Sequence, residues 1–431
     1  MTETGSRARR VCMFVYNNML HDARVRKEAR TLTQAGYDVT VVAVHEPGRT
    51  LRRESVHGFT IVRFSRSILG ASRKEIAARL RGRPLPVTAA APRPAAAAPR
   101  PRGIKARLLA RLETVLRLTL YPLRRVIVFQ RFLRAGLRTR ADVYHSHDLN
   151  TLLVGWTASR LRRARLIYDS HEVETGRARI KLRWWAKFLE HALIGRADRV
   201  ICTNRTRADF TQNLYRIPPP TILRNLPAYV EPEPSFLLHD ALELPHEAKI
   251  VLYQGGVQPE RGLEELLAAA PEIQGGLVVL LGSGRLKPAL QEQAARAGLE
   301  GKVLFHDAVP VGDLPDWTAC GYVGLQILQN TCFNHYSSLS NKLLEYLMAG
   351  VPAIASDLPE MRRVIEDTGA GVLVDTSDPH AIAEAANRLL ADESLRREMS
   401  EKAKAARRRY CWEEEEHVLV DLYRGLLTTE S

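Results

Sequence analysis

The sequence predicts an α/β protein of two domains, in each of which strands and helices alternate around a parallel sheet. Short runs rich in Val, such as 11–16, 38–44 and 249–256, are separated by segments with helical periodicity. Strands that are buried on both faces of a parallel sheet have this continuous apolar character. A Pro-rich stretch without a clear period, 226–248, interrupts the alternation and is the expected linker between the domains.

The composition is typical of a soluble globular protein. The chain has 431 residues, of which 45% are hydrophobic and 26% charged, enough for two or three domains with full-sized cores. Its five Cys residues are scattered without a Cys-x-x-Cys pair, so no zinc-site spacing is present and a reducing compartment is indicated. Residues 1–10 lead into an apolar strand without a signal core, and no run of about 18 apolar residues occurs. We therefore expect a cytoplasmic protein without a spanning helix.

The first domain is expected to span 1–225 and to open with a strand, a helix over 23–34 and a second strand. The loop before that helix carries Asp22 and Arg24. These two residues either face a ligand cleft or serve as a helix cap and a surface cation, and the pattern alone leaves both open.

The positive charge of the chain is concentrated in one segment of the first domain. Residues 66–140 hold 19 Lys/Arg and 2 Asp/Glu, whereas the whole chain has a net charge of +15. Within it, 83–103 is Pro/Ala-rich and of low complexity, which predicts a linker or loop insertion. In 104–140, apolar residues recur every three or four positions with arginines between them, and Pro122 is expected to kink or split this basic amphipathic helix.

A basic amphipathic helix is typical of contact with an anionic membrane surface, where each Arg gains about 1 kcal/mol. The alternative is that the apolar stripe packs on the first domain and the arginines are simply solvated. Nucleic acid is not an expected partner, because neither a binding motif nor interleaved aromatic residues accompany the charge.

Polar residues follow several predicted strands in the second half of the first domain. Ligands of open parallel sheets lie beyond the carboxyl ends of the strands, so these residues are expected along one rim. A lone His in such a turn is more often a capping or core group, but two turns here read His-Asp and His-Glu, which favours a site. The rim residues are His147, Asp148, His171, Glu172 and Asn204.

The second domain is expected to span 249–411. Gly255 and Gly256 end its first strand, and Arg261 precedes the following helix. Gly282 lies in a Gly-x-Gly turn after the next strand. This triplet is a weak signal for nucleotide binding, because the rest of a dinucleotide fingerprint is missing.

Residues 337–352 predict a loop, a short helix and a sharp stop. Ser340 suits the N-cap, Gly350 suits the left-handed position after the helix, and Pro352 prevents its continuation.

The first turns of this helix combine an apolar stripe with a polar face. The free N–H groups and positive dipole end at the helix start, with Lys342 beside them, suit a phosphate, and Glu345 would reach a ribose one turn further in. The alternative is an ordinary amphipathic helix with a surface Lys–Glu pair. The residues concerned are Asn341, Lys342, Leu343, Leu344 and Glu345.

The run SNKLLEYLMAGVPAIASDLPE, residues 340–360, resembles the donor-site signature of family 4 glycosyltransferases, in the branch that reads Asn-Lys-Leu-x-Glu-Tyr. The resemblance extends over nearly the whole chain except 66–140. It implies the GT-B fold, α/β with two Rossmann-like doubly wound domains that face an interdomain cleft. It also implies that 412–431 is a helix crossing back to the first domain.

The resemblance implies roles for residues of both domains. Glu345 would bind the nucleotide ribose, and residues 341–344 would line the diphosphate and the donor sugar. Arg261, with the glycine turns at Gly255, Gly256 and Gly282, would hold the phosphates, and backbone near His306 would receive the base. The expected catalytic residues are His147, Asp148 and Glu345, with His147 facing the scissile bond. Asp22, Arg24, His171, Glu172 and Asn204 are the further candidates for the cleft or the acceptor.

Two positions depart from the family pattern. Ser337 stands where much of the family has a Glu that contacts the donor sugar. Gly256 stands where a second basic residue is common, so that Lys342 or Arg285 would supply the missing charge.

The implied reaction moves a sugar from a nucleotide-diphosphate sugar of UDP or GDP type to an acceptor hydroxyl, with retention. The acceptor would be a cell-surface polysaccharide or a glycolipid, reached from the inner face of the membrane through 104–140. The chain has no Asp-x-Asp, so no metal or other cofactor is expected besides the nucleotide sugar. The alternatives are a sugar-nucleotide epimerase of related architecture, a nicotinamide-dependent oxidoreductase and a catalytically silent sugar-nucleotide binder.

Overall fold

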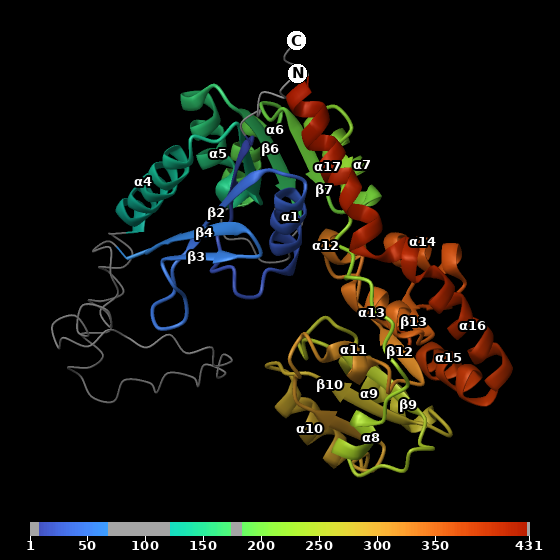
Figure 1. Ribbon diagram of the computed structural model, residues 1–431. Coiled ribbons are helices and arrows are strands. Elements are labelled where there is room, and N and C mark those ends of the chain that lie inside the picture. The colour runs from blue at the N-terminus through green and yellow to red at the C-terminus, as the bar shows by residue number, and fades with distance from the viewer. Residues whose placement is uncertain (1–7, 68–120, 174–182, 429–431) are drawn as a thin grey trace, which may run out of the picture. The chain divides into compact units, whose positions relative to one another are not determined.

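The computed structural model describes residues 8–67, 121–173 and 183–428 and has an α/β fold (Figure 1). The segment 83–103 and the first part of the basic segment, 104–120, lie outside these residues. The chain forms two compact units. The first consists of Met1–His171, Trp184–Ile201 and Leu419–Ser431, and the second of Glu172–Arg183 and Cys202–Val418.

The first sheet has the strand order β3-β4-β2-β1-β5-β6-β7-β8, and its strands belong to the first unit except for β8 and the last residue of β7. Neighbouring strands from β4 to β6 run parallel, and β3 pairs antiparallel with β4 at the edge. The chain leaves β1 in one direction and resumes at β5 on its other side, as in a doubly wound fold. The bounds are β1 Arg10–Phe14, α1 Ala23–Gln34, β2 Asp38–Val44, β3 Arg53–Val56, β4 Phe59–Phe64, α4 Tyr121–Thr139, β5 Val143–His147, α5 Leu149–Arg162, β6 Arg165–Ser170, α6 Arg183–Ile194, β7 Arg199–Cys202 and β8 Thr221–Ile222.

The second unit is organised by a parallel sheet with the strand order β11-β10-β9-β12-β13-β14. The direction of winding reverses between β9 and β12, which is the place where ligands bind in such sheets. The bounds are α7 Arg205–Tyr215, α8 Leu237–Ala241, β9 Ile250–Gln254, α9 Leu263–Ala269, β10 Leu277–Leu281, α10 Lys287–Arg296, β11 Val303–His306, α11 Leu314–Thr318, β12 Val323–Gln326, α12 Phe333–Tyr336, α13 Asn341–Ala349, β13 Ala353–Ser356, α14 Pro359–Thr368, β14 Gly371–Val374, α15 Pro379–Ala391, α16 Glu393–Ala406 and α17 Trp412–Thr428, with short 3₁₀ turns at Ala270–Glu272 and Arg407–Tyr410.

The compact units divide the chain at other places than the predicted limits of 1–225, 226–248, 249–411 and 412–431. Residues 202–248 are part of the second unit, and Leu226 and Leu238 of the expected linker are buried in its core. Helix α17 begins in the second unit, and its residues from Leu419 onward are part of the first. The segment that was expected to be a separate linker therefore contributes side chains to a core.

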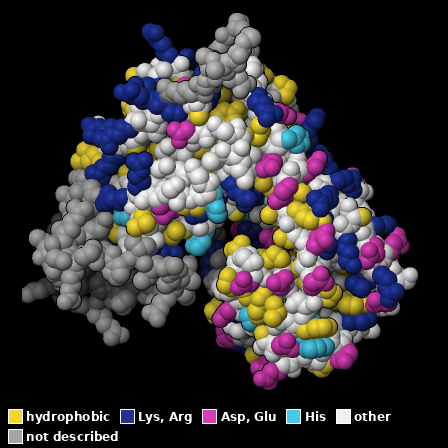
Figure 2. Space-filling model, viewed as in Figure 1, with side chains coloured by type: hydrophobic (Ala, Val, Ile, Leu, Met, Phe, Trp, Pro, Cys, Tyr) yellow, Lys and Arg dark blue, Asp and Glu magenta, His cyan; other side chains and the backbone are white. Residues whose placement is uncertain are grey.

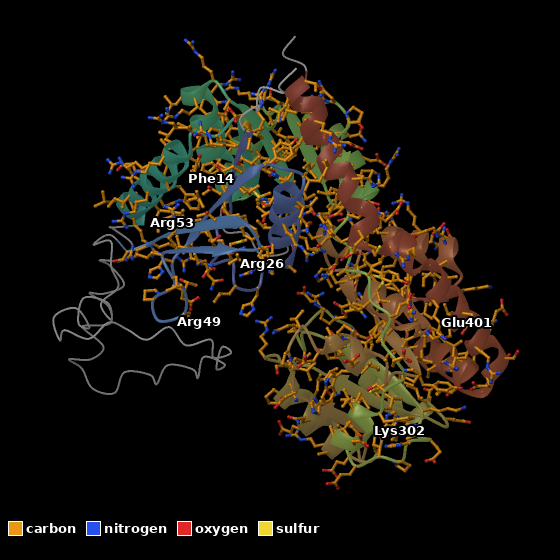
Figure 3. All side chains as sticks on the ribbon, in the orientation of Figure 1. Phe14, Arg26, Arg49, Arg53, Lys302 and Glu401 are labelled. Carbon is orange, nitrogen blue, oxygen red and sulfur yellow. The ribbon has the colours of Figure 1, made fainter. Side chains whose placement is uncertain are left out.

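The described part of the basic segment is helix α4, whose apolar stripe packs on the first sheet. Phe132 is buried, and its ring centre lies 4.3 Å from that of Phe64 and 5.9 Å from that of Phe14, which is labelled in Figure 3. Arginines occupy the outer face, and Figure 2 shows Lys and Arg gathered over this helix. Pro122 is the second residue of the described part of this helix, so the predicted kink or split at Pro122 falls at the limit of the described residues. Among the described helices, each is either too short or too polar to cross a membrane.

Candidate functional site

The turns after β9 and β10 pack closely against each other and against α13. Gly255 has a φ of +110°, and a Cβ atom there would lie 2.7 Å from Lys342 Cε. A Cβ atom at Gly282 would lie 1.9 Å from the carbonyl oxygen of Gly255. Only glycine fits both positions, so the predicted glycine turns are where backbone, Lys342 and the helix start come together.

Lys342 and Glu345 lie against the end of β9. Lys342 Nζ donates a hydrogen bond to Tyr253 Oη at 2.9 Å and lies 4.4 Å from the centre of that ring. Gln254 Nε2 donates to Glu345 Oε2 at 2.6 Å. Burial raises the pKa of Glu345, and burial together with the positive charge of Arg261 lowers the pKa of Lys342 to about 7. A bound anion beside Lys342 would favour its protonated form.

Helix α13 begins and ends as the sequence predicts, with Ser340 at the N-cap and Gly350 in the left-handed conformation. The Ser340 side chain makes no capping hydrogen bond, so the first-turn N–H groups can serve a ligand. Leu343 and Leu344 are buried in the core, and the Asn341 side chain is exposed. The two leucines can therefore contact a diphosphate only through their backbone atoms.

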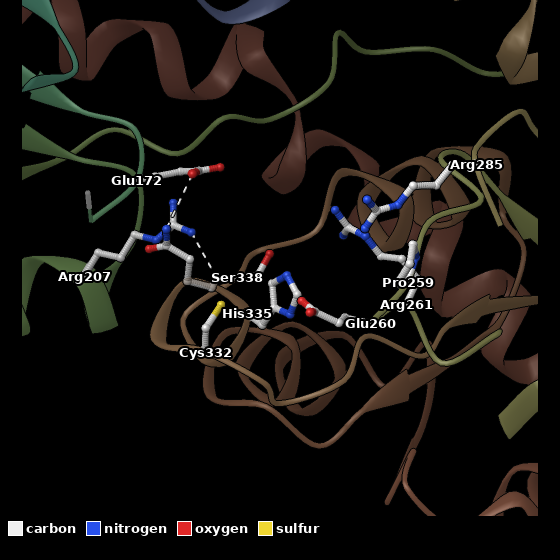
Figure 4. Close-up of a pocket in the computed structure, with 10 residues that line it drawn as sticks. Glu172, Arg207, Pro259, Glu260, Arg261, Arg285, Cys332, His335 and Ser338 are labelled. Carbon is white, nitrogen blue, oxygen red and sulfur yellow. Dashed lines mark hydrogen bonds between the residues drawn. The ribbon is translucent and has the colours of Figure 1, made fainter. Parts of the chain in front are cut away.

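A pocket of about 420 Å³ lies at the carboxyl ends of β9, β10 and β12 in the second unit (Figure 4). Arg261 and Arg285 extend into it from the loops after β9 and β10. Its size suits a small ligand, and it coincides with the reversal of strand order. The lining residues are Glu172, Arg207, Pro259, Glu260, Arg261, Arg285, Cys332, Asn334, His335 and Ser338.

His306 lies at the end of β11, on the far side of β10 from this pocket. Its ring centre is 4.8 Å from that of Trp317, and its carbonyl oxygen accepts a hydrogen bond from the Gly282 N–H at 3.0 Å. The end of β11 therefore offers ring surface and backbone polar groups next to the glycine turns.

In the first unit, Arg24 joins two buried carboxylates. Its Nη2 atom is 2.9 Å from Asp169 Oδ2, and its Nε atom is 2.9 Å from Glu28 Oε1. Burial opposes ionisation of Asp169, but the positive charges of Arg24 and His171 hold its pKa well below the usual range. The surface-cation interpretation of Arg24 is therefore wrong, because this side chain is only 5% exposed.

The histidines beside this ion pair differ in exposure and charge. The side chains of His145 and His147 are 0% exposed, whereas that of His171 is 18% exposed. Burial lowers the pKa of His145; burial also acts against the charge of His171, but Asp148 and Asp169 raise the pKa of His171 to about 9. His147 Nδ1 lies 3.1 Å from His171 Nε2. His171, rather than His147, is thus the imidazole at the surface of this cluster, and it is protonated at neutral pH.

Four buried ligand groups of this cluster lie within 4.8 Å of one another, namely those of Glu28, His145, His147 and Asp169. The guanidinium of Arg24 already lies 2.9 Å from both of the carboxylates. A metal ion would have to displace this cation, so the donor set fits a protein ion pair better than a metal ion.

Three further candidate site residues, Asp22, Asn204 and Asp148, make helix-capping or other backbone hydrogen bonds. Asp22 caps helix α1, where it accepts a hydrogen bond from the Val25 N–H at 3.0 Å. Asn204 caps α7, and its Nδ2 donates to the carbonyl oxygen of Ser337 at 2.7 Å. Asp148 has a φ of 60° and accepts from the His171 N–H at 3.1 Å instead of capping α5.

The predicted rim divides between the two units. His147, Asp148 and His171 lie together in the first, whereas Glu172 and Asn204 belong to the second. Sequence reasoning missed Gln254 and Arg207. Gln254 ends a buried strand at Glu345, and a polar residue at the end of an apolar strand was the available signal. Arg207 is one of several charges on an amphipathic helix, and nothing in the pattern distinguishes it.

Each half of the chain matches a model of a known protein family. Residues 70–225 match the model of "Glycosyltransferase Family 4", and residues 236–406 match that of "Glycosyl transferases group 1". The chain is 28% identical over 310 residues to the D-inositol 3-phosphate glycosyltransferase of Xylanimonas cellulosilytica, covering 65% of this chain and 71% of that protein. It is 26% identical over 330 residues to the enzyme of the same name from Thermobispora bispora, covering 69% and 75%.

Solved structures share the fold. Sucrose-phosphate synthase from Thermosynechococcus elongatus superposes with a TM-score of 0.74 at 18% identity, over 98% of this chain and 100% of that one. Anabaena HepE in complex with UDP-glucose gives a TM-score of 0.66 at 15% identity, over 96% and 99%. Both sheets are doubly wound, as the GT-B fold requires. With one glycosyltransferase match in each half, the chain is a glycosyltransferase of the family 4 type with the GT-B fold.

Proposed function

We propose that this enzyme transfers a sugar from a nucleoside-diphosphate sugar of UDP or GDP type to a hydroxyl of a cell-surface polysaccharide or glycolipid, with retention of anomeric configuration. The observation that carries the donor assignment is the group formed by Arg261, Arg285, Lys342 and Glu345 around the glycine turns of the second sheet.

The diphosphate would be held by two guanidinium groups and by backbone amides. Arg261 and Arg285 line the same pocket, and guanidinium groups bind phosphate oxygens with paired hydrogen bonds. The first-turn N–H groups of α13 supply further donors. Arg285 thereby provides the second cation that Gly256 cannot, and Lys342 adds charge once it is protonated.

The same groups would promote bond breaking. When the anomeric C–O bond breaks, negative charge develops on the departing diphosphate, and preorganised cations stabilise that charge in the transition state. We propose that the transfer is metal-independent, because Arg261, Arg285 and Lys342 supply the charge that a metal clamp would supply in other enzymes.

Glu345 would bind the ribose. A carboxylate accepts hydrogen bonds from hydroxyl groups, and the bond from Gln254 Nε2 at 2.6 Å fixes its orientation. Gln254 is itself fixed, since its Oε1 accepts from Thr318 Oγ1 at 2.8 Å. The base would then lie toward the end of β11, beside His306 and its backbone.

In the first unit, His171 would donate a hydrogen bond to a substrate oxygen. The buried His147 would hold the His171 ring in position through its contact with His171 Nε2. His171 is partly exposed and its pKa is raised, and His147 Nδ1 lies 3.1 Å from it. The catalytic role that the family resemblance gives to His147 is thereby extended to the pair.

Contact with an anionic membrane surface would bring the enzyme to a glycan or lipid-linked acceptor. Helix α4 has exposed apolar residues, Leu123 and Val126, next to the exposed Arg124 and Arg125. Apolar side chains flanked by cations are the usual elements of interfacial binding. We propose the inner face of the membrane as the place of action.

A thermal-shift screen with UDP-, GDP- and ADP-sugars tests the donor assignment. One nucleotide series should raise Tm, and the nucleoside diphosphate alone should give most of the shift, since the diphosphate and ribose contacts dominate. Product analysis with that donor should then give a glycosylated acceptor rather than an epimerised sugar nucleotide. If no series shifts Tm, the proposal is wrong.

A further inference from the structure

The pocket of the second unit has two chemically different ends. Arg261 and Arg285 lie at one end, and Glu172 lies at the other, with His335 between them (Figure 4). All of the lining residues belong to the same compact unit. Glu260 and Arg207 also line the pocket, and a ligand with negative charge at the arginine end and hydrogen-bond donors at the Glu172 end would match Arg261, Arg285 and Glu172.

Ser337, in the loop that lines the middle of the pocket, has no part in it. Its side chain is 0% exposed. Its hydroxyl donates to the Phe333 carbonyl oxygen at 2.8 Å and accepts from Arg207 Nε at 3.1 Å. The hydroxyl group is thus engaged with the protein, and a ligand must be recognised by other residues.

Arg207 and Asn334 fix the wall of the pocket at the Glu172 end. Arg207 Nη1 donates to Thr203 Oγ1 at 2.9 Å and Nη2 to the Asn334 carbonyl oxygen at 3.3 Å, so this cation holds the loop. Asn334 Oδ1 accepts from the Val173 N–H at 3.1 Å, which directs its Nδ2 to Glu172 Oε2 at 3.4 Å. The exposed carboxylate of Glu172 thus contacts Asn334 at the pocket wall.

The order of the strands gives the ligand a direction. Arg285 follows β10, Arg261 follows β9, and His335 follows β12, and these three strands are successive neighbours in the sheet. With the base near His306 at the end of β11, as proposed above, a diphosphate between the two arginines would have its other side toward β12. The group attached on the β12 side would then be the sugar, and Glu172 lines the same pocket beyond His335.

We propose that Glu172 binds the donor sugar by accepting hydrogen bonds from its hydroxyl or amino groups, and so selects a neutral or amino sugar. The inference rests on the proposed function, because it takes the pocket to be the donor site. An ionised carboxylate only accepts hydrogen bonds, and bonds to a charged acceptor are the stronger kind. A site built to bond a hydroxyl discriminates strongly against an analogue that lacks it.

Calorimetric titrations with UDP and UDP-glucose, or with GDP and GDP-mannose if the guanine series binds, test this assignment. Glu172→Ala and Glu172→Gln should weaken the nucleotide sugar about tenfold or more and leave the nucleoside diphosphate unchanged. Glu264→Gln, an equal change of charge on the exposed side of α9, is the control and should change neither. Glu172 is exposed, so that its variants should fold normally.

Deoxyfluoro analogues of the same sugar nucleotide identify the group that is bound, because fluorine cannot donate a hydrogen bond. The wild type should lose affinity for the analogue that is altered at the recognised position, and Glu172→Ala should bind that analogue and the parent sugar equally. If the nucleoside diphosphate binds but the Glu172 variants hold the nucleotide sugar as tightly as the wild type, the role of Glu172 is wrong. If no nucleoside diphosphate binds, the proposed function itself fails.

Discussion

Lys342 Nζ lies 2.9 Å from Tyr253 Oη and 4.4 Å from the centre of the Tyr253 ring. The ring face and the hydroxyl together hold the ammonium group at the end of β9, where Gly255 leaves room for its side chain. This contact keeps a cation close to the diphosphate site, although burial makes its protonation unfavourable.

The affinity for UDP should fall as the pH rises from 7.5 to 9. The pKa of Lys342 is lowered to about 7, so this group is protonated below that pH and increasingly neutral above it. Binding of an anion favours the ammonium form, so above pH 7 binding must take up a proton, and Kd should rise by up to about tenfold per pH unit. Calorimetry in buffers of different ionisation enthalpy measures the proton uptake directly.

The matched control is Lys342→Met, which keeps the length of the side chain without its charge. This variant should bind UDP more weakly at pH 7 and should show little pH dependence between 7.5 and 9. A wild-type Kd that stays constant over this range would contradict the coupling.

Glu345→Ala should weaken UDP binding at least tenfold, because a charged hydrogen bond to the ribose is lost. Inorganic pyrophosphate, which has no ribose, should bind wild type and variant equally in a competition assay. Glu366→Ala changes an exposed carboxylate of the same unit and serves as the control. Equal loss of UDP and pyrophosphate would show that Glu345 acts on the fold of the site instead.

Much of the fold was accessible from the sequence. The Val-rich strands and the α13 signals, with Ser340 and Gly350 at its ends, are local patterns, and the structure confirms them. The unit boundary was not accessible. Leu226 and Leu238 pack in the core of the second unit, and a local sequence pattern does not show in which of two cores a side chain is buried.

The sequence predicted the kind of site, but not which of its side chains are buried or which lie next to one another. Alternation along β5 made His145 and His147 neighbours on one face, but the sequence does not show that helix α1 covers them with Arg24 and Glu28. Their burial, and the exposure of His171, follow from this long-range packing. Arg285 is a similar case, since strand order rather than sequence distance brings it to the pocket of Arg261.

Arg24→Met should destabilise the first unit by about 3–5 kcal/mol, because it leaves Asp169 and Glu28 buried without their cation. Arg205→Met removes an exposed pair with Asp209 and should cost less than about 0.5 kcal/mol. Urea unfolding measures both.

The pH dependence of unfolding follows from the lowered pKa of Asp169. A lowered carboxyl pKa contributes stability above its unfolded value of about 4, and this contribution is lost as the pH falls below it. The wild type should therefore lose more stability on acidification than Arg24→Met does. Equal acid sensitivity of the two proteins would contradict the ion-pair account.

Charge reversal on the outer face of α4 should reduce membrane binding. Deletion of the whole segment is unsuitable, because Phe132 of this helix is part of the core. Arg124→Glu with Arg125→Glu changes only exposed residues, and each Arg near an anionic surface contributes about 1 kcal/mol. Sedimentation with phosphatidylglycerol vesicles should show at least about a tenfold loss of binding for this double variant.

Arg30→Glu with Arg160→Glu makes the same change of charge elsewhere on the first unit and should bind like the wild type. Equal losses in the two double variants would mean that net charge, and not helix α4, controls the interaction.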